Sequence, residues 1–234
     1  IAVIAYSRAV LIITFFLAAI ISAGWRIGIY ILYRYQKINL SEINVDYYVA
    51  SAHKLCGPTG VGFLYGKSEL LEALPPYQGG GEMISSVTFE KTEYADLPYK
   101  FEAGTPNISG VIGFGAAIDY MNDIGFDNIE SYEQELLKYA TDRLKEIPGI
   151  KIYGNAVNKI CIISFNLSSH HPSDIGSILD QFGIAVRTGQ HCTQPVMDYY
   201  NIPGTVRVSL SFYNTKSEID LFIDALEKTS NMLG

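Results

Sequence analysis

The chain has 234 residues, of which 48% are hydrophobic and 18% charged, so it can bury one large core or two smaller ones. Its formal net charge of -7 gives no indication of a nucleic-acid-binding face, which is typically basic. The three cysteines, Cys56, Cys161 and Cys192, are too few and scattered for a disulfide framework, so a reducing, cytoplasmic location is expected. None has the spacing of a zinc site, and no metal is expected.

The first 41 residues differ in charge from the rest of the chain. They contain no Asp or Glu, whereas all 24 acids follow from Glu42 onward. Residues 9–25 are uncharged and mostly apolar, and a second apolar run extends to residue 33. A membrane span needs at least about 17 such residues. Three interpretations stay open: a membrane helix, a pair of buried strands, or an artefact of the reading frame.

From Glu42 onward the sequence predicts an α/β protein. Short apolar runs predict buried strands, and TVRVSLSF alternates as a half-covered strand does. Amphipathic runs predict helices, and Thr215 is a candidate N-cap for the last of them. The expected strands are 47–51, 60–66, 151–154, 159–167, 184–189 and 205–212. The expected helices are 68–74, 109–123, about 129–146, 172–182 and 216–233.

The stretch SAHKLCGPTGVG, residues 51–62, places Lys54 at the end of an expected strand and before a Gly/Pro turn. Ligands of open α/β sheets bind at such strand ends. A lysine that loses hydration there becomes a candidate for a Schiff base. Ser51 and His53 offer hydrogen-bond donors for a nearby phosphate. On this stretch alone, an exposed lysine at a strand end is the competing interpretation.

Residues 187–195, RTGQHCTQP, leave three roles open for Cys192: a nucleophile, a metal ligand or an ordinary buried thiol. Gly189 and Pro195 predict a loop and therefore access to solvent. The thiolate is the reactive form of cysteine, and positive charge from Arg187 and His191 would stabilise it. Cys161, within the apolar run ICIISF, is instead expected to be unreactive core.

Arg207 alternates with two valines on the strand 205–212. If the valines face the core, Arg207 faces the other side of the sheet, where it can bind a carboxylate through two hydrogen bonds or act as a plain surface residue. Three further segments are expected to be loops: GGGEM at 79–83, FEAGTPN at 101–107, which exposes hydrogen-bond donors, and the adjacent pair His170 and His171, whose side chains point apart.

These segments occur together in an order that resembles a known family. From about residue 42 to 234, the chain resembles cysteine desulfurases of the SufS type, in the class V aminotransferase group of fold-type I pyridoxal-phosphate enzymes. The resemblance rests on SAHKLCGPTGVGFLYGK, PPYQGGGEMI, FEAGTPN, the stretch from Arg187 to Pro195, and RVSLSFYNT. It implies the fold-type I α/β fold, present as part of the large domain plus the small C-terminal domain.

The resemblance also implies a role for each matching residue. Lys54 holds the pyridoxal 5'-phosphate, Ser51 and His53 lie at its phosphate, and Thr105 reaches the phosphate of a neighbouring subunit, which implies a homodimer. Arg207 binds the substrate carboxylate and Cys192 is the nucleophile. The implied reaction removes sulfur from L-cysteine, leaves alanine, and forms a persulfide on Cys192. The sulfur then passes to an acceptor protein of iron–sulfur cluster assembly.

Two departures from the family stand out. Gln190 replaces the first of two histidines that often precede the cysteine, which we interpret as a subgroup difference. The aspartate expected upstream of Lys54, at the pyridine nitrogen of the cofactor, has no counterpart in residues 1–41. The bases encoding Gly24-Trp25-Arg26 can read Val-Asp-Gly in a neighbouring frame. We therefore hypothesise that a frameshift ends near residue 41.

The resemblance predicts three parts in the chain. Residues 1–41 are an aberrant apolar segment, 42–125 are the end of the large cofactor domain, and 126–234 are the small domain that carries the cysteine loop. Because the chain begins with Ile1, it is expected to be a fragment. Because the aspartate at the pyridine nitrogen is missing, it is expected to be inactive or nearly so by itself. The alternatives are a selenocysteine lyase, another class V aminotransferase-like enzyme, or a non-catalytic remnant. Membrane association is not expected unless residues 9–33 form a real span.

Overall fold

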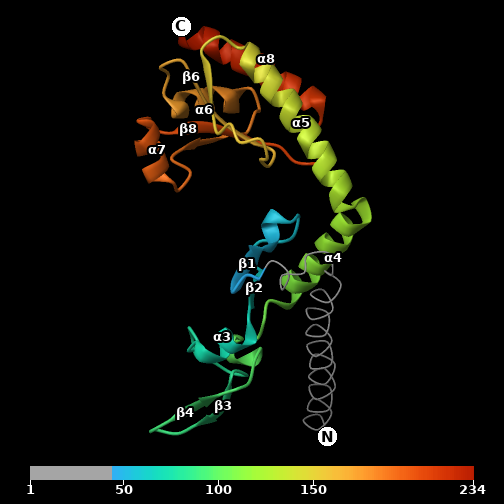
Figure 1. Cartoon of the computed structure of the whole chain (residues 1–234), viewed down its shortest axis with the longest axis vertical. Coiled ribbons are helices and arrows are strands. Elements are labelled where there is room, and N and C mark those ends of the chain that lie inside the picture. The colour runs from blue at the N-terminus through green and yellow to red at the C-terminus, as the bar shows by residue number, and fades with distance from the viewer. Residues whose placement is uncertain (1–43) are drawn as a thin grey trace, which may run out of the picture. The chain divides into compact units, whose positions relative to one another are not determined.

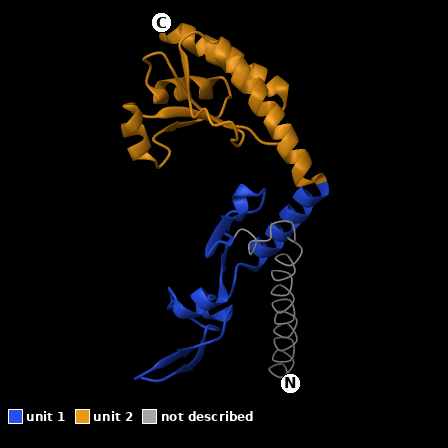
Figure 2. Ribbon diagram, viewed as in Figure 1, with its two compact units in different colours: residues 1–123 blue, residues 124–234 orange. Residues whose placement is uncertain are grey.

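The computed structural model describes residues 44–234 (Figure 1). The chain divides into two compact units, Ile1–Asp123 and Ile124–Gly234 (Figure 2). The boundary predicted from the sequence lies two residues later, between residues 125 and 126. The apolar segment 1–41, with its three interpretations and the frameshift hypothesis, lies outside the described residues. Within residues 44–234, no helix combines the length and apolarity needed to cross a membrane.

The first unit begins with an antiparallel pair of strands, β1 (Tyr47–Ser51) and β2 (Gly62–Gly66). Both strands were predicted, but their predicted burial is wrong. Val49 is 72% exposed and Leu64 is 50% exposed. An apolar strand is buried on both faces only where layers cover both, and this pair is packed mainly through Phe63 on one face.

Helix α4 (Ile108–Ile124) confirms the helix predicted at 109–123 and covers that face. The rings of Phe114 and Phe63 stack with centroids 6.3 Å apart. A Cβ added to Gly113 would lie 3.3 Å from Cγ of Pro58, so the small residue allows close approach of the loop after Lys54. Among residues 44–123, the buried cluster is small, with Ala52, Phe114 and Ile118 at its centre.

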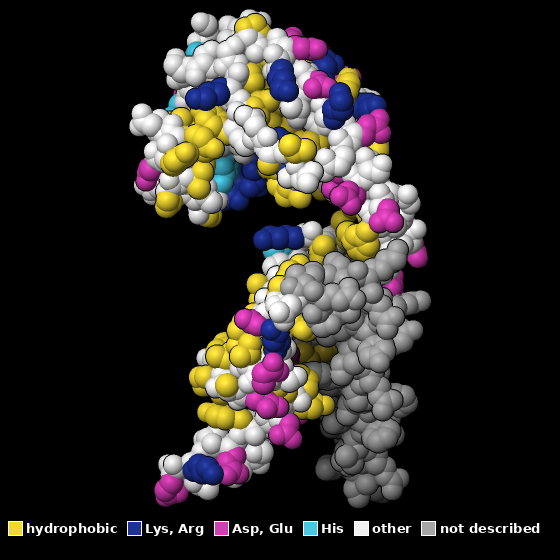
Figure 3. All heavy atoms as spheres, in the orientation of Figure 1, with side chains coloured by type: hydrophobic (Ala, Val, Ile, Leu, Met, Phe, Trp, Pro, Cys, Tyr) yellow, Lys and Arg dark blue, Asp and Glu magenta, His cyan; other side chains and the backbone are white. Residues whose placement is uncertain are grey.

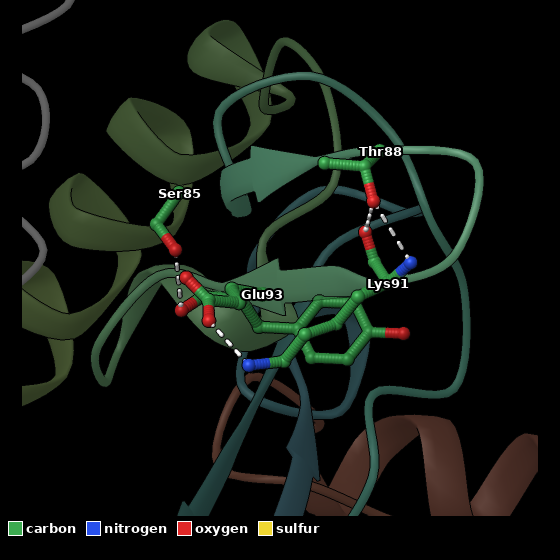
Figure 4. A network of polar contacts seen from close by, with 5 residues as sticks. Ser85, Thr88, Lys91 and Glu93 are labelled. Carbon is green, nitrogen blue, oxygen red and sulfur yellow. Dashed lines mark hydrogen bonds and ion pairs between the residues drawn. The ribbon is translucent and has the colours of Figure 1, made fainter.

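The middle of the first unit is a helix followed by a hairpin. Helix α3 (Ser68–Ala73) was predicted, whereas the hairpin of β3 (Ile84–Val87) and β4 (Thr92–Tyr94) was not. The hydroxyl of Thr88 accepts backbone N–H bonds at the turn and donates to the carbonyl of Lys91 (Figure 4). Local polar bonds of this kind, rather than an apolar core, hold the turn of the hairpin.

The second unit contains a four-stranded antiparallel sheet in the order β5-β6-β8-β7. Alternate side chains of the strands form one apolar face, which α5, α6 and α8 cover (Figure 1). Leu136, Phe165, Leu179, Val206 and Leu226 are fully buried there. The strands are β5 (Ile150–Tyr153), β6 (Ile162–Leu167), β7 (Arg187–Gly189) and β8 (Thr205–Ser209).

The helices predicted in this unit are confirmed, with small shifts at their ends. Thr215 is the N-cap of α8, as predicted, and forms a reciprocal capping box with Glu218. A short helix that follows the cysteine loop, α7, was not predicted. The helices are α5 (Phe126–Glu146), α6 (Pro172–Gln181), α7 (Gln194–Tyr200) and α8 (Lys216–Leu233).

Candidate active site

Lys54 ends a short 3-10 helix, η1 (Ala52–Lys54), that directly follows β1. The lysine is exposed, while Ala52 is fully buried and anchors the turn. The carbonyl of Ala52 accepts N–H bonds from Leu55 at 2.8 Å and from Gly57 at 2.9 Å. A Cβ on Gly57 would lie 2.9 Å from the same oxygen, so the tight turn requires glycine there.

Ser51, His53 and Lys54 therefore lie within one turn of chain, as their spacing predicted. Within residues 44–234, none of these three side chains forms a hydrogen bond or an ion pair with the protein. A primary amine, a hydroxyl and an imidazole are thus available to a ligand. The strand that leads to them belongs to an antiparallel pair, not to the open parallel sheet on which the sequence argument relied.

The segment FEAGTPN, residues 101–107, is a turn, as predicted, and the side chain of Asn107 ties it to the loop after Lys54. The Nδ2 of Asn107 donates to the carbonyl of Gly60 at 3.3 Å, and its Oδ1 accepts from the N–H of Gly110 at 3.0 Å. Thr105 lies in this turn and is exposed, with no hydrogen bond to its hydroxyl within residues 44–234. Asn107 lies in a segment predicted to be a loop, and nothing in its local sequence indicated this structural role.

The segment GGGEM, residues 79–83, was predicted to be a flexible loop. Its Gly81 carbonyl accepts an N–H bond from Gly104 at 2.9 Å, so it is attached to the turn that carries Thr105. Met83 at its end is fully buried. Burial raises the pKa of the nearby carboxyl of Glu102 above its ordinary value. The loop is therefore part of the packed first unit.

Cys192 belongs to the second unit and is exposed, as the loop prediction required. It lies in a turn that the N–H of Thr193 closes onto the carbonyl of Gln190 at 2.9 Å. The two central residues of this turn, His191 and Cys192, have positive φ angles of 55° and 63°. Nη2 of Arg187 lies 3.5 Å from Sγ of Cys192 and donates to it.

His191 does not act as the second cation that the sequence predicted. Its Nε2–H donates to the carbonyl of Thr205 at 3.1 Å, and the Thr205 hydroxyl lies 2.9 Å from the same nitrogen. Burial lowers the pKa of His191, the charges of Arg207 and Arg187 lower it further, and the bond to Thr205 only partly opposes them. The imidazole is therefore neutral at pH 7.

Arg207 projects from the polar face of the sheet, as predicted, because Val206 and Val208 on either side of it are buried. It is the direct cross-strand partner of Arg187. Strands β5 to β8 contain no carboxylate, and neither arginine forms an ion pair within residues 44–234. Figure 3 shows basic and histidine side chains together on one side of this unit. An unneutralised pair of guanidinium groups favours binding of an anion.

Two other predicted features have structural roles. Cys161 is buried, so the prediction that it belongs to the core is confirmed, and burial together with the charge of Glu133 raises its pKa to about 11. His171 caps α6, with its Nδ1 accepting from the N–H of Ser173. Among residues 44–234, no group of His, Cys, Asp and Glu side chains has the arrangement of a metal site.

Comparison with known proteins covers both units. The sequence profile of the family described as aminotransferase class-V matches residues 33–222. The chain belongs to the class-V aminotransferase family. A cysteine desulfurase of Serratia proteamaculans is 47% identical over 201 residues, which are 86% of this chain and 49% of that protein. The chain thus spans about half the length of the curated relatives that it matches.

Solved structures of class-V aminotransferase relatives agree with this assignment. The crystal structure of the cysteine desulfurase CsdA from Escherichia coli has a TM-score of 0.78 at 39% identity, over 83% of this chain and 48% of that one. The apo cysteine desulfurase of Thermococcus onnurineus NA1 also has a TM-score of 0.78, at 37% identity, over 83% and 49% of the two chains. The predicted fold class, part of a fold-type I α/β enzyme, is confirmed.

Proposed function

We propose that the protein containing this chain is a cysteine desulfurase dependent on pyridoxal 5'-phosphate. The observation that carries the proposal is the exposed thiol of Cys192, which is held in a turn next to Arg187. An aminotransferase that only moves amino groups needs no such thiol, whereas sulfur transfer requires a nucleophile that first accepts sulfur and then presents it. Lys54, Ser51, His53 and Thr105 supply the second requirement, a cofactor site.

The functional groups of these four residues match those of the cofactor. The amine of Lys54 suits its aldehyde, and the donors on Ser51, His53 and Thr105 suit its phosphate. The observation that supports the fit is that all four side chains are without protein partners among residues 44–234. Bound pyridoxal phosphate would supply an electron sink for bonds broken at the substrate α-carbon. Lys54 would move the α-proton, and Arg207 would bind the substrate carboxylate.

Cys192 would carry the sulfur. Its thiolate forms a sulfur–sulfur bond with the sulfur of L-cysteine while the carbon–sulfur bond of the substrate breaks. The electron pair of that bond and a proton end on the β-carbon, which gives L-alanine. The thiol of an acceptor protein then attacks the outer sulfur and leaves Cys192 as the thiolate. An exposed position suits both transfers, because the same atom must reach a small molecule and a protein.

We further propose the SufS type, a role in iron–sulfur cluster assembly, a homodimer and a cytoplasmic location. The order of the five sequence segments supports the type and the role, and Thr105 supports the dimer. The three cysteines are unpaired within the described residues, which suits a reducing compartment.

Cofactor binding and sulfur transfer can be tested separately. After pyridoxal phosphate is added, we expect visible absorbance that persists through gel filtration and is absent from the Lys54→Ala variant. Lys67→Ala is the matched control, because Lys67 is a lysine of the same unit that pairs with Asp46. A chromophore that survives in Lys54→Ala would contradict the proposed lysine.

For sulfur transfer, the full-length protein should release alanine from cysteine and carry one extra sulfur atom on Cys192, detected by peptide mass spectrometry. Cys192→Ser should lose the extra sulfur, whereas Cys56→Ser should keep it. For the 234-residue chain, we expect little or no turnover, because residues 1–41 offer no carboxylate for the pyridine nitrogen. Substantial alanine release by that chain would refute this expectation.

A further inference from the structure

The turn that presents Cys192 places two non-glycine residues at positive φ angles, a conformation that His tolerates better than Cys does. Gln190 and Thr193 close it with two bonds to the Gln190 carbonyl, from the Thr193 N–H at 2.9 Å and from the Thr193 hydroxyl at 2.8 Å. Positive φ angles at both central positions are typical of type I′ turns, in which Gly, Asn and Asp predominate. His191 and Cys192 occupy these positions here. Contacts outside the turn must therefore stabilise it.

The side chain of His191 makes such a contact. Its Nε2–H donates to the carbonyl of Thr205, a residue that is only 1% exposed at the start of β8. The chain is tightly packed there, because a Cβ on Gly204 would lie 2.8 Å from the backbone of Gly189. Thr205 and Gly189 are also cross-strand partners. One end of the hydrogen bond is thus fixed in the sheet, and the other lies in the strained turn.

The same bond determines what surrounds the sulfur. Strand β7 carries Arg187, whose Nη2 reaches Sγ of Cys192 across the turn. That contact requires the turn to fold back over the ends of β7 and β8. If the turn relaxed to ordinary negative φ angles, the sulfur would move away from the guanidinium. The hydrogen bonds between Thr193 and Gln190 lie within the turn, so they do not prevent the whole loop from moving away from β8. The bond from His191 to Thr205 does prevent it.

We propose that His191 is a positioning residue: its bond to Thr205 holds the turn so that the exposed sulfur of Cys192 stays beside Arg187. This inference deepens the proposed function and rests on it, because it takes Cys192 as the sulfur-accepting nucleophile. His191 acts through the turn and through Arg187, and it transfers no proton to or from the substrate. Its ring nitrogen at Nδ1 is buried and has no hydrogen-bond partner among residues 44–234.

Two substitutions distinguish this role from an effect of the residue's backbone preference for positive φ. In His191→Gln, the side-chain Nε2 can still reach Thr205, but glutamine does not favour positive φ. Asparagine favours positive φ, yet in His191→Asn its shorter side chain does not reach Thr205. The proposal therefore predicts that Gln preserves the site better than Asn. A turn governed only by backbone preference predicts the opposite order.

The readout is the rate at which iodoacetamide alkylates Cys192 in the whole 234-residue chain, followed by peptide mass spectrometry. Cys56, exposed in the other unit, is the internal reference in the same molecule. We expect the ratio of the Cys192 rate to the Cys56 rate to fall about fivefold in His191→Asn and His191→Ala, as for the loss of one net hydrogen bond. In His191→Gln the ratio should stay within about twofold of the parent.

A double variant tests whether His191 acts through Arg187. In the Arg187→Gln background, His191→Asn should have little further effect on the ratio, because the contact that it maintains is already absent. Additive effects, an Asn variant as reactive as Gln, or a ratio unchanged in all variants would each overturn the proposal. Because alkylation needs neither cofactor nor substrate, its outcome is independent of the chromophore test for Lys54.

Discussion

At the residue scale, the sulfur of Cys192 and the guanidinium of Arg187 form a contact between a weak acceptor and a permanent cation. The 3.5 Å separation from Nη2 to Sγ is within hydrogen-bonding range for sulfur. A negative charge on sulfur strengthens such a bond, whether the sulfur is that of a thiolate or of a persulfide. Arg187 is exposed, so water screens part of the interaction.

Removing the positive charge of Arg187 should slow the alkylation of Cys192. For Arg187→Gln, we expect the rate of Cys192 alkylation at pH 7, relative to Cys56, to fall about two- to fivefold, the size expected of an exposed charge contact. Arg187→Lys should retain part of the rate, because the charge remains without the planar fork. Lys151→Gln is the control, since it removes a cation from the same sheet without touching the sulfur. An equal loss in that control would refute a specific contact.

The neutral state of His191 gives a pH prediction. Burial first, then the charges of Arg207 and Arg187, lower its pKa below the ordinary value of 6.5. The unfolded chain therefore binds the proton more readily than the folded chain. Well above pH 6.5, His191 is neutral in both states and the free energy of unfolding does not depend on its titration. As the pH falls below that value, the unfolded chain takes up the proton first, and the free energy of unfolding decreases. The imidazole NMR signal that disappears in His191→Gln should titrate below its midpoint in urea, and a higher midpoint would contradict the assignment.

Residue types and spacing could identify the chemistry of the candidate site but not its contacts. Arg187 and His191 both lie within five residues of Cys192 in the sequence, and both were expected to supply positive charge. The structure separates them, because the turn directs one toward the sulfur and the other toward Thr205. The role of Thr205 could not be predicted from its residue type, because it accepts the bond through a backbone carbonyl, which every residue has. Such partners depend on tertiary packing and cannot be obtained from local spacing.

At the element scale, α8 depends on its first turn. Oγ1 of Thr215 accepts from the N–H of Glu218 at 3.3 Å, and Oε2 of Glu218 accepts from the N–H of Thr215 at 2.7 Å. The apolar side of α8 then covers the sheet with Ile219, Phe222 and Leu226. The cap therefore fixes where a core helix of the second unit begins.

Removing the cap should cost stability without altering the core. For Thr215→Ala, we expect the free energy of unfolding to fall by about 1 kcal/mol. Thr215→Ser retains the hydroxyl and should stay within about 0.5 kcal/mol of the parent. Urea unfolding followed by far-ultraviolet circular dichroism measures both variants. If serine lost as much stability as alanine, packing of the threonine methyl group and not the cap would be responsible.

The long periodic helices were predictable from the sequence, whereas helix α7 and the hairpin of β3 and β4 were not. The helices at 126–146 and 216–233 show a sustained apolar stripe. Pro148-Gly149 mark the C-terminal end of the first, and the Thr215 cap marks the N-terminal end of the second. Helix α7 has only seven residues, and the hairpin of β3 and β4 has strands of four and three. In α7 and in this hairpin, the apolar residues do not repeat regularly enough to distinguish the segments from loops.

At the scale of the whole molecule, the two units differ in how much core they bury. The second unit contains a continuous cluster of eighteen buried residues formed by α5, α6, α8 and the sheet. Among residues 44–123, the described part of the first unit, the buried cluster has three such residues, and Val49, Tyr77 and Phe89 are largely exposed. Burial of apolar area is the main favourable contribution to folding, so within residues 44–234 the second unit should hold most of the stability.

Hydrogen exchange can test this asymmetry in the intact chain. Amides of β6 and β8 should exchange at least about tenfold more slowly than amides of β1 and β2, because they open only when the larger core unfolds. Leu226→Ala, which removes a fully buried side chain of α8, should cost about 2–5 kcal/mol and speed exchange in β6 and β8. The same variant should leave exchange in β1 and β2 unchanged. Equal protection of all four strands in the parent protein would show that stability does not follow the buried clusters. Faster exchange of β1 and β2 in Leu226→Ala would show that the two units unfold together.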